Sequence, residues 1–324
     1  MGASHQLPSY SQLPISPDRP PRSAWGVFGD DDELGTINLL TEERARRGLA
    51  CAQRGAVFSL NWALEEPSPP FYGRQPLVHH IDRPLAGLPI LDDSMDTFFT
   101  QASSQWDALC HVGHPEYGFY NGRRDEDFTG VEGTRNGVEH MARKGIVGRG
   151  VLLDMARHWA SINRPLDGGA TVEFTVDDLE DCRRAQGVEI ETGDILLIRT
   201  GWMEWYLNAG AETRQDLAND SLARLRTPGV IGGEAMAEYL WDLHVSAVAA
   251  DNPAFEAWPH ALEVDRYLHY RLIGLLGIPM GEMWFLEDLA ADCAADRIYE
   301  FCLTSAPLNL RGGVGSPPNA LAIK

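Results

Sequence analysis

Cysteine is scarce in this chain, and its cysteines stand far apart. The 324 residues contain five, Cys51, Cys110, Cys182, Cys293 and Cys302, and no two have Cys-x-x-Cys spacing. An odd, scattered set favours reduced thiols over a disulfide framework and predicts a cytoplasmic protein. We expect Cys110 to be a small buried side chain and not a nucleophile, because the sequence dedicates no base to it.

Basic residues and long hydrophobic runs are also few. The chain has 27 Lys and Arg against 47 Asp and Glu, a net charge of −20. Such a field repels nucleic acid and anionic membranes, so we expect neither as a partner. No stretch is apolar enough to span a bilayer, and the N-terminus lacks the charged start and apolar run of a secretory signal. The partner we expect is a small-molecule substrate.

What the sequence does contain is enough apolar material for a substantial core, since 44% of the residues are hydrophobic. Residues 1–24 are rich in Ser and Pro and predict an extended N-terminal arm, followed by one catalytic domain over residues 25–324. Thr175 with Asp178 three residues on predicts a capped helix over residues 176–186. Apolar runs at 151–154 and 195–200 are typical of buried strands.

The remaining elements follow from the same patterns. We expect strands over residues 56–62, 97–101, 245–250, 297–304 and 319–323, and helices over 41–54, 233–243 and 260–276. The proline-rich stretch 65–91 predicts a long loop near the functional site. Strands and helices alternate along the chain, which predicts an α/β domain with a mixed sheet.

The most informative segment is Gln101-Ala-Ser-Ser-Gln-Trp-Asp-Ala-Leu-Cys-His111. In an extended stretch, alternation would turn its polar side chains to one face. A short helix starting near Asp107 would return His111 to the same side. Carboxylate and imidazole together suit zinc or manganese.

Each of these residues also has an ordinary structural interpretation. Asp107 alone would more often be a helix N-cap, and His111 alone a satisfied structural histidine. Their four-residue offset favours a site. Trp106 and Tyr120 could line an aromatic substrate pocket or equally belong to the core.

This segment resembles the signature His-x-Gly-Thr-His-x-Asp-x-x-x-His of the metal-dependent cyclase family, which includes bacterial kynurenine formamidases and isatin hydrolases. The last two signature residues fall on Asp107 and His111, and the first two histidines fall on Gln101 and Gln105. The stretch 269–282 is similar to a later family segment that runs from a histidine to a glutamate. The resemblance implies a swivelling β/β/α fold.

The resemblance also implies a divalent metal, zinc or manganese, held by Asp107, His111, His269 and Glu282. Glutamine is a weaker metal ligand than histidine, so Gln101 and Gln105 are expected to contact substrate, together with Trp106 and Tyr120. His111, His269 and Glu282 are the expected catalytic residues.

The function implied is a metal-dependent hydrolase, or the reverse cyclase, acting on a cyclic amide, a lactone or an N-acyl amine. The two glutamines leave open a metal-free acid–base cyclase or dehydratase of secondary metabolism. A silent binding protein is a third alternative, disfavoured because burying four ionisable groups without a task is costly. The proline-rich arm and the resemblance suggest a homodimer or homotetramer.

Overall fold

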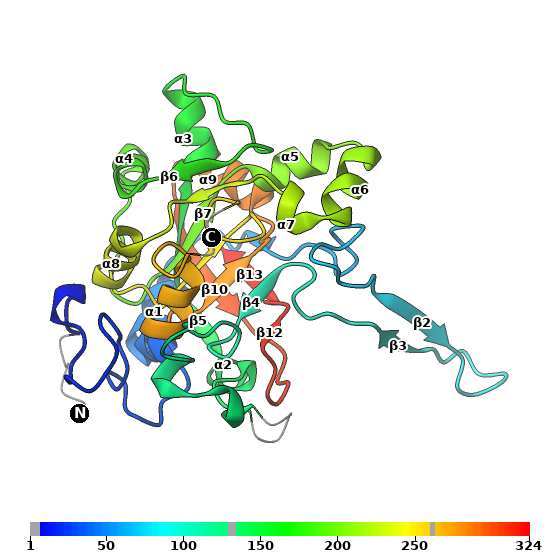
Figure 1. Ribbon diagram of the computed structural model, residues 1–324. Helices are drawn as coiled ribbons and strands as arrows, with labels where there is room; N and C mark the ends of the chain where they lie inside the picture. Colours follow the sequence, from blue (N-terminus) through cyan, green and yellow to red (C-terminus); the bar gives the residue numbers. More distant parts are fainter. Residues whose placement is uncertain (1–6, 129–133, 260–262) are drawn as a thin grey trace.

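The computed structural model describes residues 7–128, 134–259 and 263–324. Within these ranges one mixed sheet has nine strands: β1 (Val57–Ser59), β4 (Gln105–Asp107), β5 (Ile146–Asp154), β7 (Ile195–Arg199), β9 (Ala247–Ala250), β10 (Met280–Glu282), β11 (Glu300–Ser305), β12 (Gly315–Ser316) and β13 (Ala320–Ile323). Their spatial order is β1-β13-β11-β5-β7-β9-β10-β4-β12. Figure 1 shows this sheet at the centre of the molecule.

The middle of the sheet is parallel and both of its margins are antiparallel. Strands β5, β7, β9 and β10 run parallel, whereas β11, β13 and β1 on one side and β4 and β12 on the other pair antiparallel. All five residues of β7 are buried, as expected for a strand covered on both faces. Alternation sends Leu196 and Ile198 into one core cluster and Ile195 and Leu197 into the other.

Helices cover both faces of the sheet (Figure 1). The α-helices are α1 (Glu42–Ala50), α2 (Val138–Lys144), α3 (Met155–Ser161), α4 (Val176–Gln186), α5 (Trp202–Asn208), α6 (Ala211–Asn219), α7 (Ser221–Arg224), α8 (Glu234–Asp242) and α9 (Glu287–Asp296). A π-helix, η5, spans Tyr270–Leu276, and short 3-10 helices are η1 (Tyr10–Gln12), η2 (Gly35–Leu39), η3 (Tyr120–Gly122) and η4 (Asp125–Asp127). None of the described helices is long and apolar enough to cross a membrane.

Two small ribbons lie outside the main sheet. Strands β6 (Val172–Phe174) and β8 (Pro228–Val230) pair in parallel. Strands β2 (Val78–Asp82) and β3 (Asp92–Asp96) form an antiparallel hairpin that projects from the body (Figure 1).

The described part of the N-terminal arm packs on the body of its own chain. The indole nitrogen of Trp241 in α8 donates to the carbonyl of Pro8 at 2.9 Å, and Asp242 accepts from the backbone N–H of Tyr10 at 2.6 Å. Tyr10 and Leu13 are buried. Pro8 and Tyr10 are therefore held against α8, and the backbone N–H of Ala24 donates to the carbonyl of Leu275 at 2.9 Å.

The prediction of an α/β domain with a mixed sheet is confirmed. Helix α4 begins after Thr175 with the expected capping box to Asp178, because that motif satisfies backbone donors locally. The expected strands at 195–200, 245–250, 297–304 and 319–323 are present with ends shifted by a few residues. Sequence patterns therefore predicted correctly the helix that carries a capping motif and the strands that are rich in apolar residues.

Five predicted elements were wrong in part. Residues 97–101 form no strand, since the strand begins at Gln105, and no helix starts at Asp107. Of the helix expected over 260–276, residues 260–262 lie outside the described ranges, and helical structure begins at Leu268. The expected loop 65–91 contains strand β2. The helix expected to reach residue 54 ends at Ala50.

Candidate functional site

Strand β4 turns its three side chains alternately to two faces. Gln105 and Asp107 share one face, and Trp106 lies on the other, in the core beside Trp284. Strand β10 pairs antiparallel with β4 and places Glu282 opposite Gln105. Directly opposed residues project to the same face. Glu282 therefore joins Gln105 and Asp107.

Two glycines allow the close approach of these segments. A Cβ at Gly281 would lie 2.6 Å from the indole nitrogen of Trp284 and 2.7 Å from Cβ of Ala249. A Cβ at Gly315 in β12 would lie 2.5 Å from Cγ of Gln101. A larger residue at Gly315 would displace Gln101.

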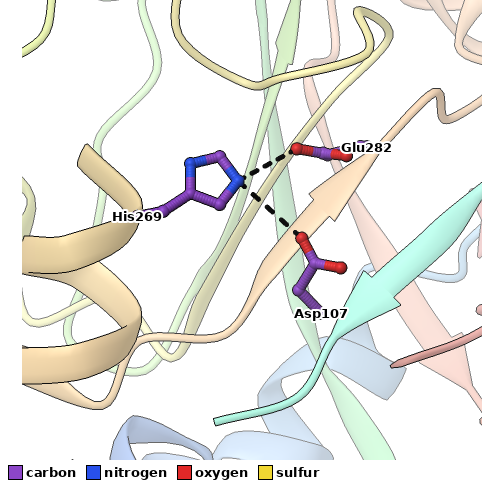
Figure 2. A group of neighbouring side chains, drawn as sticks. All are labelled: Asp107, His269 and Glu282. Carbon is purple, nitrogen blue, oxygen red and sulfur yellow. Dashed lines mark hydrogen bonds and ion pairs between the residues drawn. The ribbon is translucent and has the colours of Figure 1, made fainter. Parts of the chain in front are cut away.

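His269 reaches the same place from a distant part of the sequence. Its Nε2 lies 3.1 Å from Oε1 of Glu282 and 3.9 Å from Oδ2 of Asp107. Figure 2 shows the three side chains pointing toward one another from the start of the helical segment, from β10 and from β4. Their ligand atoms all lie within 4.8 Å of one another, and all three residues are buried.

Glu256 orients the imidazole of His269. Its Oε1 lies 3.2 Å from Nδ1 of His269 and also accepts from the backbone N–H of Leu268 at 3.2 Å. A carboxylate on one ring nitrogen directs the other nitrogen at a metal. We did not predict this residue from the sequence, although a lone Glu between Phe255 and Ala257 signals a buried, partnered charge.

Gln101 and Gln105 hold the carboxylates of the site. Their side-chain nitrogens donate to Oδ1 of Asp107 at 2.8 and 3.2 Å. Gln105 also donates to Oε2 of Glu282 at 2.7 Å, and the amide nitrogen of Gln101 lies 3.0 Å from Nδ1 of His111. An amide nitrogen is a donor and coordinates no cation. These contacts position Asp107 and Glu282, and the expected contacts of both glutamines with substrate stay a prediction.

His111 returns to the site through a turn instead of the expected helix. Its backbone N–H donates to the carbonyl of Ala108 at 2.9 Å, and its Nε2 lies 3.8 Å from Oδ1 of Asp107. The His111 side chain is 28% exposed, whereas the Asp107 side chain is 0% exposed. His111 therefore occupies the more accessible side of the site.

Burial and charge divide the titrating groups into two kinds. Burial lowers the pKa of His111, so its imidazole is neutral near pH 7 and can accept a proton. Burial and the charge of Asp107 raise the pKa of Glu282 to about 7. Burial opposes a charge on His269, but the negative charges of Glu256 and Glu282 outweigh it and raise the pKa of His269 well above its usual value. His269 and Glu282 therefore share a proton in one hydrogen bond.

Arg74, Tyr72 and Tyr267 complete the surroundings, and of these Arg74 and Tyr267 were missed in the sequence. After burial, the positive charge of Arg74 is one of the influences that lower the pKa of His111. The Arg74 guanidinium lies 5.2 Å from the centroid of the Tyr72 ring. The Tyr267 ring stacks on His269 with centroids 4.6 Å apart. The one signal for Arg74 was its place in the proline-rich stretch expected near the site.

Two residues expected at the substrate lie elsewhere. Trp106 is fully buried and donates to the hydroxyl of Ser305 at 2.9 Å, on the opposite face of β4 from Asp107. Tyr120 is also fully buried, and its hydroxyl donates to Asp32 at 3.1 Å. The alternation that brings Asp107 into the site necessarily sends Trp106 into the core. Neither ring contacts the site, so we correct both expectations.

The trio Asp107, His269 and Glu282 fits a divalent cation. Two carboxylates and an oriented imidazole are common ligands of such ions. Oδ2 of Asp107 and Oε1 of Gln105 are buried and accept no hydrogen bond from the described part of the chain. A buried acceptor without a donor is costly, and a cation beside Asp107 would remove that cost.

Comparison with known proteins identifies the family. Residues 52–257 match the family model Cyclase, described as "Putative cyclase". A crystal structure described as a novel cyclase is 33% identical, covers 93% of this chain and 97% of its own, and has a TM-score of 0.82. The chain belongs to the cyclase family. It is therefore an enzyme with hydrolase or cyclase activity.

More distant structures share the fold. Isatin hydrolase A from Ralstonia solanacearum is 20% identical, with 87% of this chain and 97% of that chain covered and a TM-score of 0.57. Isatin hydrolase A from Labrenzia aggregata, bound to benzyl benzoate, is 18% identical, with 82% and 93% covered and a TM-score of 0.55. A comparison with curated proteins finds no match.

Proposed function

We propose that this enzyme is a metal-dependent hydrolase that opens a cyclic amide or a lactone, or cleaves an N-acyl amine, at the carbonyl. Ring closure is the reverse reaction and would use the same site. The observation that carries the proposal is the convergence of Asp107, His269 and Glu282, with Nε2 of His269 3.1 Å from Glu282 and 3.9 Å from Asp107. Two structures with this fold are isatin hydrolases, and isatin is a cyclic amide.

Asp107, His269 and Glu282 would hold the ion, zinc or manganese. His111, which the sequence also predicts as a ligand, is left as a proton carrier in this proposal, because an imidazole nitrogen bound to a cation cannot accept a proton. When bound, such an ion supplies Lewis-acid chemistry at a carbonyl and makes a water molecule more acidic. Glu256 keeps His269 directed at this position. Gln105 has a buried carbonyl oxygen free of donors among the described residues. That oxygen can accept a hydrogen bond from water or from substrate.

His111 is the proposed proton carrier. Its imidazole is held neutral by burial and is the more exposed of the two site histidines, at 28% against 4% for the His269 side chain. A neutral imidazole can take the proton of attacking water and deliver it to the leaving nitrogen or oxygen. His269 and Glu282 lie deeper and share a proton already.

We propose one ion per chain, because the amide nitrogens beside Asp107 donate and do not coordinate. The double substitution Gln101→His/Gln105→His places two imidazoles beside Asp107. Metal analysis by mass spectrometry should find close to one ion per wild-type chain and close to two per variant chain. A variant that stays at one ion would contradict the assignment of these two positions.

Metal dependence itself is tested with a panel of probes: isatin as the cyclic amide, dihydrocoumarin as the lactone and an N-formyl aniline as the acyl amine. Hydrolysis of each releases an acid, which a pH indicator reports. Turnover should disappear after dialysis against a chelator and return with zinc or manganese. Full turnover with less than about one-tenth of an ion per chain would exclude the mechanism, since functional ions need a defined coordination shell.

One observation favours the metal-free alternative. The hydrogen bond between His269 and Glu282, 3.1 Å long, is itself a proton-sharing pair of the kind that acid–base catalysis uses. A cyclase or dehydratase of secondary metabolism could work with this pair and His111. The chelation experiment separates the two functions, because this alternative predicts unchanged turnover.

We also propose a cytoplasmic location and a small-molecule substrate without a nucleic-acid or membrane partner. The five cysteines are free, in agreement with a reducing compartment. The net charge of −20 works against binding to nucleic acid and anionic lipid.

A further inference from the structure

The turn at residues 71–74 holds an unfavourable backbone conformation close to the candidate site. Its two central residues, Tyr72 and Gly73, have φ values of +60° and +70°, and the backbone N–H of Arg74 donates to the carbonyl of Phe71 at 3.2 Å. Glycine adopts a positive φ readily, whereas a bulky residue such as tyrosine adopts it at a cost. Strain of this kind persists only where the surroundings hold it, and it is concentrated at functional sites.

The surroundings anchor this turn to the core and to α7. Phe71 is fully buried, and its ring centroid lies 6.0 Å from that of Trp202 and 5.7 Å from that of Tyr206. The backbone N–H of Tyr72 donates to the hydroxyl of Ser221 at 3.0 Å. Packing of a buried ring and a hydrogen bond to a helix therefore hold the turn in one place.

Tyr72 connects the turn to the candidate site. Its hydroxyl lies 3.5 Å from the carbonyl oxygen of Pro253, three residues before Glu256. Glu256 in turn lies 3.2 Å from Nδ1 of His269. The guanidinium of Arg74 lies over the Tyr72 ring, 5.2 Å from its centroid, in the arrangement of a cation–π contact. The turn therefore places a cation beside the segment that orients the site histidine.

Arg74 has no carboxylate partner among the described residues, although the chain contains 47 Asp and Glu. It is half-buried, and its side chain makes no hydrogen bond to the described part of the chain. By contrast, the buried Arg199 contacts three carboxylates. The N–H groups of a guanidinium form a fork that matches the two oxygens of a carboxylate. Arg74 therefore offers such a fork to a ligand.

The positive charge of Arg74 acts on two groups of the site. Burial lowers the pKa of His111 and raises the pKa of Glu282, and the charge of Arg74 contributes in the lowering direction to both. No ion pair joins Arg74 to Glu282 or Asp107 in the described structure. The guanidinium therefore acts on the site through space and keeps its own N–H groups for another partner.

We propose that Arg74 binds a carboxylate that the substrate carries in addition to the carbonyl group that is attacked. The inference rests on the proposed hydrolase function and restricts its substrates to anionic compounds. The net charge of −20 and the carboxylates of Asp107, Glu256 and Glu282 oppose the approach of an anion. Recognition of an anionic substrate therefore needs a cation held beside the site, and the anchored turn supplies one.

The test compares acyl amines that share the reacting bond and differ by one carboxylate: N-formylaniline and the N-formyl derivatives of 2-, 3- and 4-aminobenzoate. The wild type should prefer the best of the three carboxylates over N-formylaniline by about 10- to 100-fold in kcat/KM, as expected of a hydrogen bond to a charged group. Arg74→Gln should remove this preference, chiefly by raising KM for the carboxylate compound. Arg74→Lys should restore part of it, since lysine keeps the charge without the fork.

The matched control is Arg143→Gln. Arg143 is an exposed residue of α2 that makes no ion pair with a described residue. This variant should keep the preference of the wild type, because it removes the same charge from a position outside the site.

Binding of the products gives a measurement that needs no turnover. Hydrolysis of these substrates releases formate and an aminobenzoate or aniline. In titration calorimetry, at least one aminobenzoate should bind the wild type about 10-fold more tightly than aniline, and Arg74→Gln should abolish the difference. If this difference is found but no compound is hydrolysed, the hydrolase function fails and the anion site stands. Equal binding of aminobenzoates and aniline, or a preference that survives in Arg74→Gln, would overturn the proposal.

Discussion

Strands β3 and β4 lie nine residues apart in the sequence and occupy opposite environments. All five residues of β3 are exposed, and all three of β4 are buried. Both strands end in an aspartate. Asp96 meets His80 and solvent, whereas Asp107 is fully buried and has one carboxylate oxygen without a hydrogen-bond donor among the described residues. The same residue type is a solvated charge in one strand and a candidate ligand in the other.

The two regions differ because their neighbours differ. Strand β4 lies between β10 and β12, and its two faces meet the site and the core. The hairpin pairs with itself alone within the described chain. The candidate site therefore lies where the sheet buries polar side chains and provides hydrogen-bond partners for most of their atoms. The hairpin instead leaves its apolar side chains exposed.

The largest effect is expected on the core side of β4. Trp106→Ala should lower the free energy of unfolding by about 3–5 kcal/mol, because it removes a fully buried indole and its hydrogen bond to Ser305. Urea denaturation measures the loss. Leu222→Ala, at an exposed position, should change it by less than about 0.5 kcal/mol. Normal stability together with a raised KM would instead indicate that Trp106 contacts the substrate.

On the site face, His269→Ala should reduce kcat/KM more than about 100-fold, beyond the loss expected for a residue that acts through a ligand. The bound metal, measured by mass spectrometry, should fall in parallel. His158→Ala, at a half-buried histidine of α3 outside the site, is the control and should retain both. If the variant keeps its metal, the ion is bound elsewhere, and β4 would no longer differ from β3 in carrying a metal ligand.

Glu256→Gln sharpens the comparison, because it keeps the shape of the side chain that holds Nδ1 of His269 and removes its charge. Metal affinity or turnover should fall by about 10- to 100-fold. Titration with zinc measures the affinity. Glu212→Gln, at an exposed residue of α6, should leave it unchanged.

The half-buried pair of His140 and Glu33 is intermediate between the two regions, and the smallest effect is expected there. A hydrogen bond of 2.8 Å to Glu33 raises the pKa of His140 above its unfolded value of about 6.5. Its stabilisation is fully present below the unfolded pKa and is lost as the pH rises through the folded pKa. His140→Gln should therefore cost about 0.2–1 kcal/mol in mild acid, where His140 is charged and Glu33, whose pKa is lowered, is still ionised, and nothing at alkaline pH. Urea unfolding in mild acid and at alkaline pH measures this, and an equal loss at both would mean that the charge is irrelevant.

The sequence by itself determined the elements whose signals are local. Thr175 and Asp178 close a capping box without outside help, and the run Ile195–Arg199 is apolar enough to be buried wherever the sheet forms. Periodicity and capping gave the α/β class, and the spacing from Asp107 to His111 and from His269 to Glu282 gave the family resemblance that the comparisons confirm. The capping box and the buried strand depend on neighbours within one turn or one strand, and the resemblance depends on residue types at fixed spacing in the sequence.

Only the tertiary structure decided which residues form the site. A strand of three residues such as β4 exists because β10 and β12 pair with it, so its register and the inward position of Trp106 could not be read from residues 97–111. Glu256 lies 13 residues from His269, and the folded chain brings their side chains together. The burial of a side chain and its hydrogen-bond partners depend on the assembled sheet, because water is excluded by segments that are distant in the sequence.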